Sequence, residues 1–225
     1  MTEQHITIAI DGPGGAGKSA VADEVAKKLG ILHLDTGAMY RAFAFQALKE
    51  GIDPSDEAAL TALVDRIDIR VELQENGIQR TLVNGTDVTD KIRTPEISFA
   101  ASTSSKCGAV RQYMVAKQQA IARTRSMILD GRDIGTKVLI DATLKVFLTA
   151  TPEERAKRRY EQLLENGQKA DYQTVLADII ARDKQDSTRA IDPLRPADDA
   201  VLIDNTHYVQ AQTVAEVVRL LEARL

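Results

Sequence analysis

A glycine-rich segment near the N-terminus carries the most specific chemical pattern in this 225-residue sequence. Residues 12–19 match the pattern G-x-x-x-x-G-K-S at every fixed position, directly after an apolar run and before a helical one. In such a segment backbone N–H groups surround phosphate oxygens, a lysine supplies a mobile cation and a serine hydroxyl can ligate Mg²⁺. We therefore predict a site for a nucleoside triphosphate and Mg²⁺, formed by Gly12, Pro13, Gly14, Gly15, Ala16, Gly17, Lys18 and Ser19.

Several arginines are placed where a second anionic ligand could bind. Arg41 and Arg132 each follow a predicted strand, and open parallel sheets bind ligands outside the carboxyl ends of their strands. Further along the chain, Arg182 and Arg189 flank Asp186. A site that joins two phosphorylated molecules must offset several negative charges, which arginine forks do with directional hydrogen bonds. The joint placement therefore favours phosphoryl transfer over a set of unrelated surface ion pairs.

The phosphate-binding pattern alone does not separate a kinase from a GTPase or an ATP-driven motor. The chain has no Asn-Lys-x-Asp motif, which recognises guanine in GTPases. Residues 130–133 also lack the Asp-x-x-Gly spacing of a GTPase switch. An acceptor phosphate is already anionic and needs no general base, whereas a hydroxyl acceptor would need a positioned carboxylate. Asp35, Asp130 or Asp133 could serve as that base, so a kinase for AMP, UMP or a hydroxyl-bearing metabolite stays an alternative. A regulatory module that hydrolyses its nucleotide slowly is an alternative from another class.

The elements that must position these groups alternate between strand and helix. Such alternation predicts an α/β fold with a doubly wound parallel sheet. Short apolar runs predict strands at residues 5–11, 31–34, 127–129, 144–148 and 200–203. Helical spacing and end signals predict helices at 19–29, 37–50 and 95–125, after Thr151, and at the C-terminus.

One segment departs from this alternation. Residues 67–73 and 78–83 alternate apolar and polar side chains with period two, and turn residues stand at 75–77 and 84–85. We predict a small antiparallel β lobe over residues 65–93, inserted into a core formed by 1–64 and 94–225.

Composition limits the partners of the protein. The net charge of -4 gives no footprint for nucleic acid or an anionic membrane, and no apolar run is long enough for a membrane span. The single cysteine, Cys107, excludes an internal disulfide and is predicted to be a small buried or neutral thiol. We expect a cytoplasmic monomer.

The histidines, His5, His33 and His207, lack metal-site spacing and a partnered carboxylate motif, and are predicted at the surface or at strand edges.

Taken together, the motifs resemble those of the bacterial cytidylate kinases, nucleoside monophosphate kinases of the P-loop NTPase superfamily. The resemblance runs from end to end. The segments Asp-Gly-Arg-Asp-Ile-Gly at 130–135 and Ile-Arg-Thr-Pro-Glu at 92–96 are far more specific than the phosphate loop. Further support comes from residues 35–41, 84–89 and 182–189.

The resemblance implies transfer of the γ-phosphoryl group of ATP to CMP or dCMP, with Mg²⁺. It assigns the acceptor phosphate to Thr36, Arg41, Arg132 and Arg189, the cytosine edge to Ser102, Arg111 and Asp133, and the ribose to Arg182 and Asp186. Lys18, Arg41, Arg132 and Arg189 would be the catalytic set. Residues 152–190 would form a helical lid whose Arg158 and Arg159 contact ATP. Ala20 departs from the Thr or Ser usual in the family, so a hydroxyl contact to the donor's α-phosphate is lost or replaced by the backbone.

Overall fold

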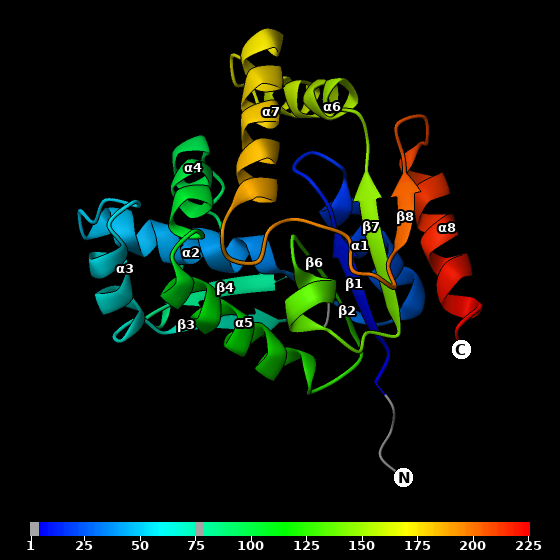
Figure 1. Cartoon of the computed structure of the whole chain (residues 1–225), viewed down its shortest axis with the longest axis horizontal. Helices are drawn as coiled ribbons and strands as arrows, with labels where there is room; N and C mark the ends of the chain where they lie inside the picture. Colours follow the sequence, from blue (N-terminus) through cyan, green and yellow to red (C-terminus); the bar gives the residue numbers. More distant parts are fainter. Residues whose placement is uncertain (1–4, 75–78) are drawn as a thin grey trace.

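The computed structural model describes residues 5–74 and 79–225, and its centre is a five-stranded parallel sheet (Figure 1). The strand order is β2-β6-β1-β7-β8. The strands are β1 (Thr7–Asp11), β2 (Leu32–Asp35), β6 (Met127–Gly131), β7 (Leu144–Thr149) and β8 (Val201–Asp204). The central strands are buried on both faces, which explains their near-continuous apolar runs. The predicted doubly wound parallel sheet is confirmed.

Helices cover both faces of the sheet because successive side chains of a strand point to opposite sides. Ile8 and Ile10 of β1 pack into one core cluster with apolar residues of α1 (Lys18–Leu29) and α8 (Gln210–Glu222). Ala9, between them, belongs to a second cluster with α2 (Thr36–Lys49) and α5 (Gly108–Ala122). Cys107 is buried in this second cluster, as predicted.

A separate antiparallel sheet consists of β3 (Ile69–Leu73), β4 (Gln79–Val83) and β5 (Thr86–Asp87). Asn84 and Gly85 have φ angles of 49° and 78°, the left-handed pair that a tight hairpin of type I′ requires. The predicted antiparallel β element is therefore confirmed, together with its second turn. The turn predicted at 75–77 lies outside the described residues. The division of the chain into a core and an inserted lobe stays a prediction.

The remaining helices include a pair, labelled α6 and α7, that lies above the upper end of the sheet in Figure 1. They are α3 (Glu57–Val64), α4 (Pro95–Ser104), α6 (Pro152–Glu165), α7 (Tyr172–Thr188) and the short π-helix η1 (Ile134–Val138). The region predicted as largely helical, 95–125, forms two helices, α4 and α5, separated at residues 105–107. Thr94 and Thr151 cap α4 and α6 through their hydroxyls, each followed by proline at the first helical position.

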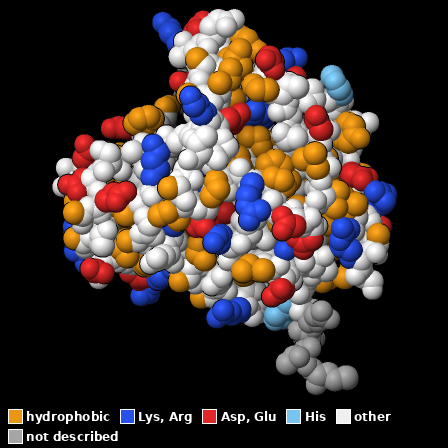
Figure 2. All heavy atoms as spheres, in the orientation of Figure 1, with side chains coloured by type: hydrophobic (Ala, Val, Ile, Leu, Met, Phe, Trp, Pro, Cys, Tyr) orange, Lys and Arg blue, Asp and Glu red, His pale blue; other side chains and the backbone are white. Residues whose placement is uncertain are grey.

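The α6–α7 pair packs around a small cluster of its own, formed by Ala156, Val175 and Ile179. Among the helices of the described residues, none is both long and apolar enough to cross a bilayer. On the face shown in Figure 2, basic and acidic side chains are interspersed.

Candidate active site

The loops that follow β1, β2 and β6 begin side by side at the carboxyl edge of the sheet. Asp11 pairs in register with Gly131, and Asp35 with Asp130. Because these strands end together, the phosphate loop, the start of α2 and the segment after Gly131 meet around one cleft of about 680 Å³. The predicted site residues that line it are Gly14, Gly15, Gly17, Lys18, Ser19, Ala20, Thr36, Arg41, Ser102, Arg111, Arg132, Asp133, Arg158, Arg159, Arg182, Asp186 and Arg189.

The three predicted loop residues that do not line the cleft support the loop from beneath. Gly12 lies so close to β7 that a Cβ atom would come within 1.9 Å of the Leu148 carbonyl oxygen, and its φ is 149°. The carbonyl of Pro13 accepts a hydrogen bond from Lys18 Nζ at 2.7 Å. The carbonyl of Ala16 accepts one from Asn205 at 3.0 Å. These residues hold the loop in place, while the other loop residues face the cleft.

Lys18 is a buried cation among other cations. Its side chain lies within a site lined by Arg132 and Arg182, and only 6 % of Lys18 is exposed. Burial, and then the charge of Arg132, lower the pKa of Lys18 well below its ordinary value. A bound polyanion would relieve this repulsion, so the electrostatics of the cleft favour phosphate groups.

Three arginines from three different segments project into the cleft. Arg41 donates to Asp35 Oδ2 at 2.8 Å, and Arg132 donates to Asp186 Oδ2 at 2.9 Å. Arg189 donates through Nε to the carbonyl of Asp192. Within the described residues, Arg41 Nε and Arg189 Nη2 are buried and have no hydrogen-bond partner. Because an unsatisfied buried donor is costly, these two groups mark positions where an anion fits.

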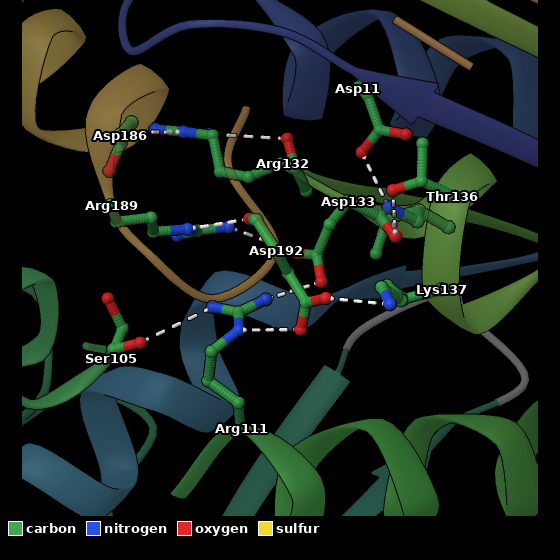
Figure 3. A network of polar contacts seen from close by, with 12 residues as sticks. Asp11, Ser105, Arg111, Arg132, Asp133, Thr136, Lys137, Asp186, Arg189 and Asp192 are labelled. Atoms are coloured by element: carbon green, nitrogen blue, oxygen red, sulfur yellow. Dashed lines mark hydrogen bonds and ion pairs between the residues drawn. The ribbon is translucent and has the colours of Figure 1, made fainter. Parts of the chain in front are cut away.

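Arg111 forms the floor of the site, with 2 % of its surface exposed. It is ion-paired with Asp133 and, at 3.0 Å, with Asp192 (Figure 3). Arg189 Nη2 lies 3.7 Å from the other oxygen of Asp133. Asp133 therefore stands between two guanidinium groups and keeps acceptor capacity toward the cleft.

The other side chains assigned to the acceptor nucleotide come from α4, α7 and the start of α2. Ser102 lies inside α4, and its hydroxyl accepts from Gln185 at 2.7 Å, next to Asp186. Arg182 Nε is 4.0 Å from Asp186. The hydroxyl of Thr36 donates its hydrogen to the Asp130 carbonyl at 2.7 Å. While this bond is in place, Thr36 can donate to a bound phosphate only through its backbone N–H.

The residues beside Lys18 fit Mg²⁺. The hydroxyl of Ser19 donates to Asp130 Oδ2 at 2.8 Å, which places two hard oxygen ligands at the phosphate loop. Mg²⁺ is commonly bound by one or two such groups together with substrate phosphates. Burial opposes the ionised form of Asp130, but the hydrogen bond from His33 lowers the pKa of this carboxyl below its ordinary value.

His33 corrects part of a prediction from the sequence: it lies on the edge strand β2, but it is buried and has carboxylate partners. It is 7 % exposed, with Nδ1 at 2.6 Å from Asp23 and Nε2 at 2.8 Å from Asp130. Burial opposes its charge, but the hydrogen bonds to the two carboxylates raise the pKa of His33 to about 10. Asp130 is 97 residues away in the chain, so no local motif signals the pairing.

The raised pKa of His33 predicts a pH-dependent stability. The unfolded imidazole titrates near pH ~6.5, so the stabilisation is complete below that pH and is lost as pH rises toward 10. His33→Gln should lower the free energy of unfolding at pH 7 by about 3 kcal/mol, because it leaves the buried carboxylate of Asp130 without its charged partner. Denaturant unfolding between pH 7 and 10 should show a smaller decline for this variant than for the wild type. The exposed His207→Gln serves as the control, and equal slopes for all three proteins would refute the pairing.

Helix α6 contributes a contact that the sequence did not reveal. Arg158 and Arg159 line the cleft, while their role in a lid stays a prediction, and Arg158 also donates to the Asn205 carbonyl at 2.8 Å. Arg155, one turn earlier, is buried; it donates to the Gly14 carbonyl at 3.0 Å and pairs with Asp183 of α7. Arg155 thereby ties both helices of the α6–α7 pair to the phosphate loop.

Two further polar residues position the loops, and sequence reasoning assigned neither of them. Asp11 accepts from the backbone N–H groups of Ile134 and Gly135 at 2.8 and 2.7 Å, which fixes the segment after Arg132. Burial raises the pKa of Asp11 to about 6. Gln79 of β4 bonds to both the N–H and the carbonyl of Asp35 and so joins the small sheet to β2. Asp11 ends a predicted strand, and this position could have indicated a role at the site. The sequence around Gln79 carries no such signal.

Solved structures share this architecture at low sequence identity. An uncharacterized protein from Eubacterium ventriosum superposes with a TM-score of 0.55 at 14% identity, covering 98% of this chain and 99% of that one. A gluconokinase from Sinorhizobium meliloti gives a TM-score of 0.50 at 16% identity, covering 97% and 92%. These similarities concern the fold alone.

Sequence relatives are much closer. Residues 8–223 match the family model described as cytidylate kinase. The cytidylate kinase of Bacillus subtilis is 48% identical, covering 98% of this chain and 97% of its own. That of Caldicellulosiruptor saccharolyticus is 47% identical, covering 96% of both chains, and that of Halalkalibacterium halodurans is 46% identical, covering 99% and 100%. The chain belongs to the cytidylate kinase family of ATP-dependent phosphotransferases.

Proposed function

We propose that this protein transfers the γ-phosphoryl group of ATP to CMP or dCMP, giving ADP and CDP or dCDP. The observation that carries the proposal is the convergence of Lys18 with Arg41, Arg132 and Arg189 in one cleft. Two of these arginines present buried N–H groups that have no hydrogen-bond partner among the described residues. The proposal includes Mg²⁺ dependence, a monomeric state and a cytoplasmic location, for which the composition of the sequence is the support.

The donor side is formed by the phosphate loop. Its backbone N–H groups and Lys18 would hold the β- and γ-phosphates of ATP at the start of α1. Bound by Ser19 Oγ with Asp130 beside it, Mg²⁺ would supply charge neutralisation between these phosphates. Arg158 and Arg159 would close over ATP from α6 and exclude water.

The acceptor side places the phosphate of CMP among the three arginines. An oxygen of that phosphate attacks the γ-phosphorus, a new O–P bond forms, and the bond from the γ-phosphorus to the bridging oxygen of ADP breaks. The attacking oxygen is already anionic, so no general base is needed. Lys18, Arg132 and Arg189 would stabilise the charge spread over the transferring group, while Arg41 would orient the acceptor phosphate.

The base and sugar would be recognised by the remaining polar residues. Arg111 and Asp133 would face the cytosine edge; the Asp133 carboxylate can accept from the cytosine amino group, whereas uracil presents an acceptor there and would be repelled. Arg182 and Asp186 would address the ribose hydroxyls. Ser102 of α4, whose hydroxyl accepts from Gln185 of α7, would contact the cytidine from the same side as Arg182 and Asp186.

Measurement of ADP release across acceptors tests the proposal. With ATP and Mg²⁺ present, CMP and dCMP should give the highest kcat/KM, exceeding that of UMP by about 10- to 100-fold, the usual discrimination of a paired hydrogen-bonding group. AMP and a hydroxyl acceptor such as shikimate serve as comparisons, and a reaction without acceptor measures hydrolysis. Equal rates with CMP, AMP and shikimate would overturn the acceptor assignment, and an undiminished rate without acceptor would favour a nucleotide-hydrolysing switch.

A further inference from the structure

The segment that follows α7 is closed into a compact loop around the acceptor side of the cleft. At its start, Arg189 Nε donates to the carbonyl of Asp192 at 2.7 Å. At its end, the N–H of Leu194 donates to the carbonyl of Asp186 at 2.8 Å. Both ends are thus held by backbone carbonyls, and Asp192 lies between them.

Asp192 contacts three basic residues from three separate parts of the fold (Figure 3). One carboxylate oxygen accepts from Arg111 Nε of α5 at 3.0 Å. The other lies 3.0 Å from Lys137 Nζ of η1. With its main-chain carbonyl bonded to Arg189, the residue uses its side chain and its backbone for different partners.

The backbone of Asp192 is adapted to this position. Its φ angle is 47°, in the left-handed region that Gly, Asn and Asp tolerate better than other residues. In that conformation the carbonyl faces Arg189 while the carboxylate faces Arg111. A residue that disfavours left-handed φ would disturb both contacts, whereas Asn or Gly would retain the carbonyl contact and change only the side chain.

Arg111 and Arg189 are neighbouring cations that need such support. Asp133 lies between them, ion-paired with Arg111 and 3.7 Å from Arg189 Nη2. Burial, and then the charge of Arg111, lower the pKa of Arg189, which reflects the repulsion between the two guanidiniums. Without the carboxylate of Asp192, Arg111 would have Asp133 as its single carboxylate partner among the described residues. Arg111 would then draw the Asp133 carboxylate away from Arg189 and from the cleft.

We propose that Asp192 is a positioning residue for the acceptor site, which orients Arg111 through its carboxylate and Arg189 through its main-chain carbonyl. This inference rests on the proposed function, since it takes CMP as the ligand of these arginines. Asp192 is absent from the lining of the catalytic cleft, so it acts through the arginines and not by touching the nucleotide.

The test compares Asp192→Asn, Asp192→Gly and Asp192→Leu with Asp198→Asn. Asp198 is a fully exposed acid of the same segment, so its variant makes the same charge change without the contacts to Arg111. The Asn and Gly variants should raise the KM and the calorimetric Kd for CMP by about 10- to 100-fold, the loss expected for a charged hydrogen bond, with kcat and the KM for ATP within about twofold of wild type. The Leu variant should also lower kcat, because Arg189 loses its support.

Each outcome decides the inference. Values for Asp192→Asn equal to those of Asp198→Asn would overturn it while leaving the proposed function intact. A uniform rise in the KM of both ATP and CMP, together with a large fall in melting temperature, would indicate a general structural role and would also overturn it. Wild-type protein that neither binds nor phosphorylates CMP would refute the proposed function itself, and this inference with it.

Discussion

Lys18→Ala is expected to lower kcat with saturating ATP and CMP by about 10³-fold or more, because the variant removes the cation nearest the transferring phosphate. Lys18 is buried, its Nζ is held by the Pro13 carbonyl at 2.7 Å, and its surroundings are already positive. Among the described residues that line the cleft there is no second lysine to take over this position. Steady-state and single-turnover kinetics with CMP measure the effect.

A matched control for this variant lies on the same helix. Lys27 of α1 has a side chain that is 70% exposed, and its partner is the surface residue Glu24. Lys27→Ala should therefore retain wild-type kinetics. Lys18→Met, which preserves the apolar stem in its buried channel, should lose as much activity as Lys18→Ala. Turnover of either Lys18 variant within threefold of wild type would contradict the assignment of the phosphate loop.

Arg189→Ala is expected to lower kcat by on the order of 10²-fold or more, with a smaller change in the KM for CMP. The buried Nη2 of Arg189 has no hydrogen-bond partner among the described residues and lies 3.7 Å from Asp133, at the boundary between this carboxylate and the acceptor arginines. If this group stabilises charge on the transferring phosphoryl, its loss is felt mainly in the transition state. Initial rates over a grid of ATP and CMP concentrations separate kcat from KM.

Arg195→Ala provides the comparison for Arg189. Arg195 belongs to the same segment after α7, but its side chain is 59% exposed and pairs with Asp198 at the surface. Its removal should leave both kinetic constants unchanged. A rise in KM alone for Arg189→Ala would mean that Arg189 binds the ground state of CMP, and the catalytic role would pass to Arg132 and Lys18.

The sheet was predictable because its strands carry local signals. Apolar runs such as residues 5–11 and 144–148 are long enough for a strand and too short for a helix, and each is followed by a loop or helix start. The antiparallel element was predictable for a related reason: its side chains alternate, and Asn84 and Gly85 suit a tight turn. Helix α3 and η1 carried weaker patterns and were not predicted.

Candidate site residues were found where a motif lies at the end of a strand. Lys18, Arg41 and Arg132 each follow a strand of the parallel sheet, so their shared location follows from topology. The sequence alone could not distinguish the residues that face the cleft from the residues that support it. Whether Gly12 binds a ligand or gives room to the Leu148 carbonyl depends on a contact across more than a hundred residues of chain.

The supporting residues were missed because their partners are distant in sequence. His33 bridges Asp23 and Asp130, Arg155 reaches Gly14, and Asp192 joins two other elements. A histidine, arginine or aspartate in isolation resembles any polar surface residue. Only the fold determines that such a side chain is buried and what it contacts, so this layer of the site required the structure.

A crystal structure with CMP and a non-hydrolysable ATP analogue tests the central claim most directly. We predict the CMP phosphate between Arg41, Arg132 and Arg189, with the γ-phosphate of the analogue beside Lys18 and in line with an acceptor oxygen. A CMP phosphate bound away from these arginines, or a γ-phosphate directed away from it, would contradict the proposed transfer.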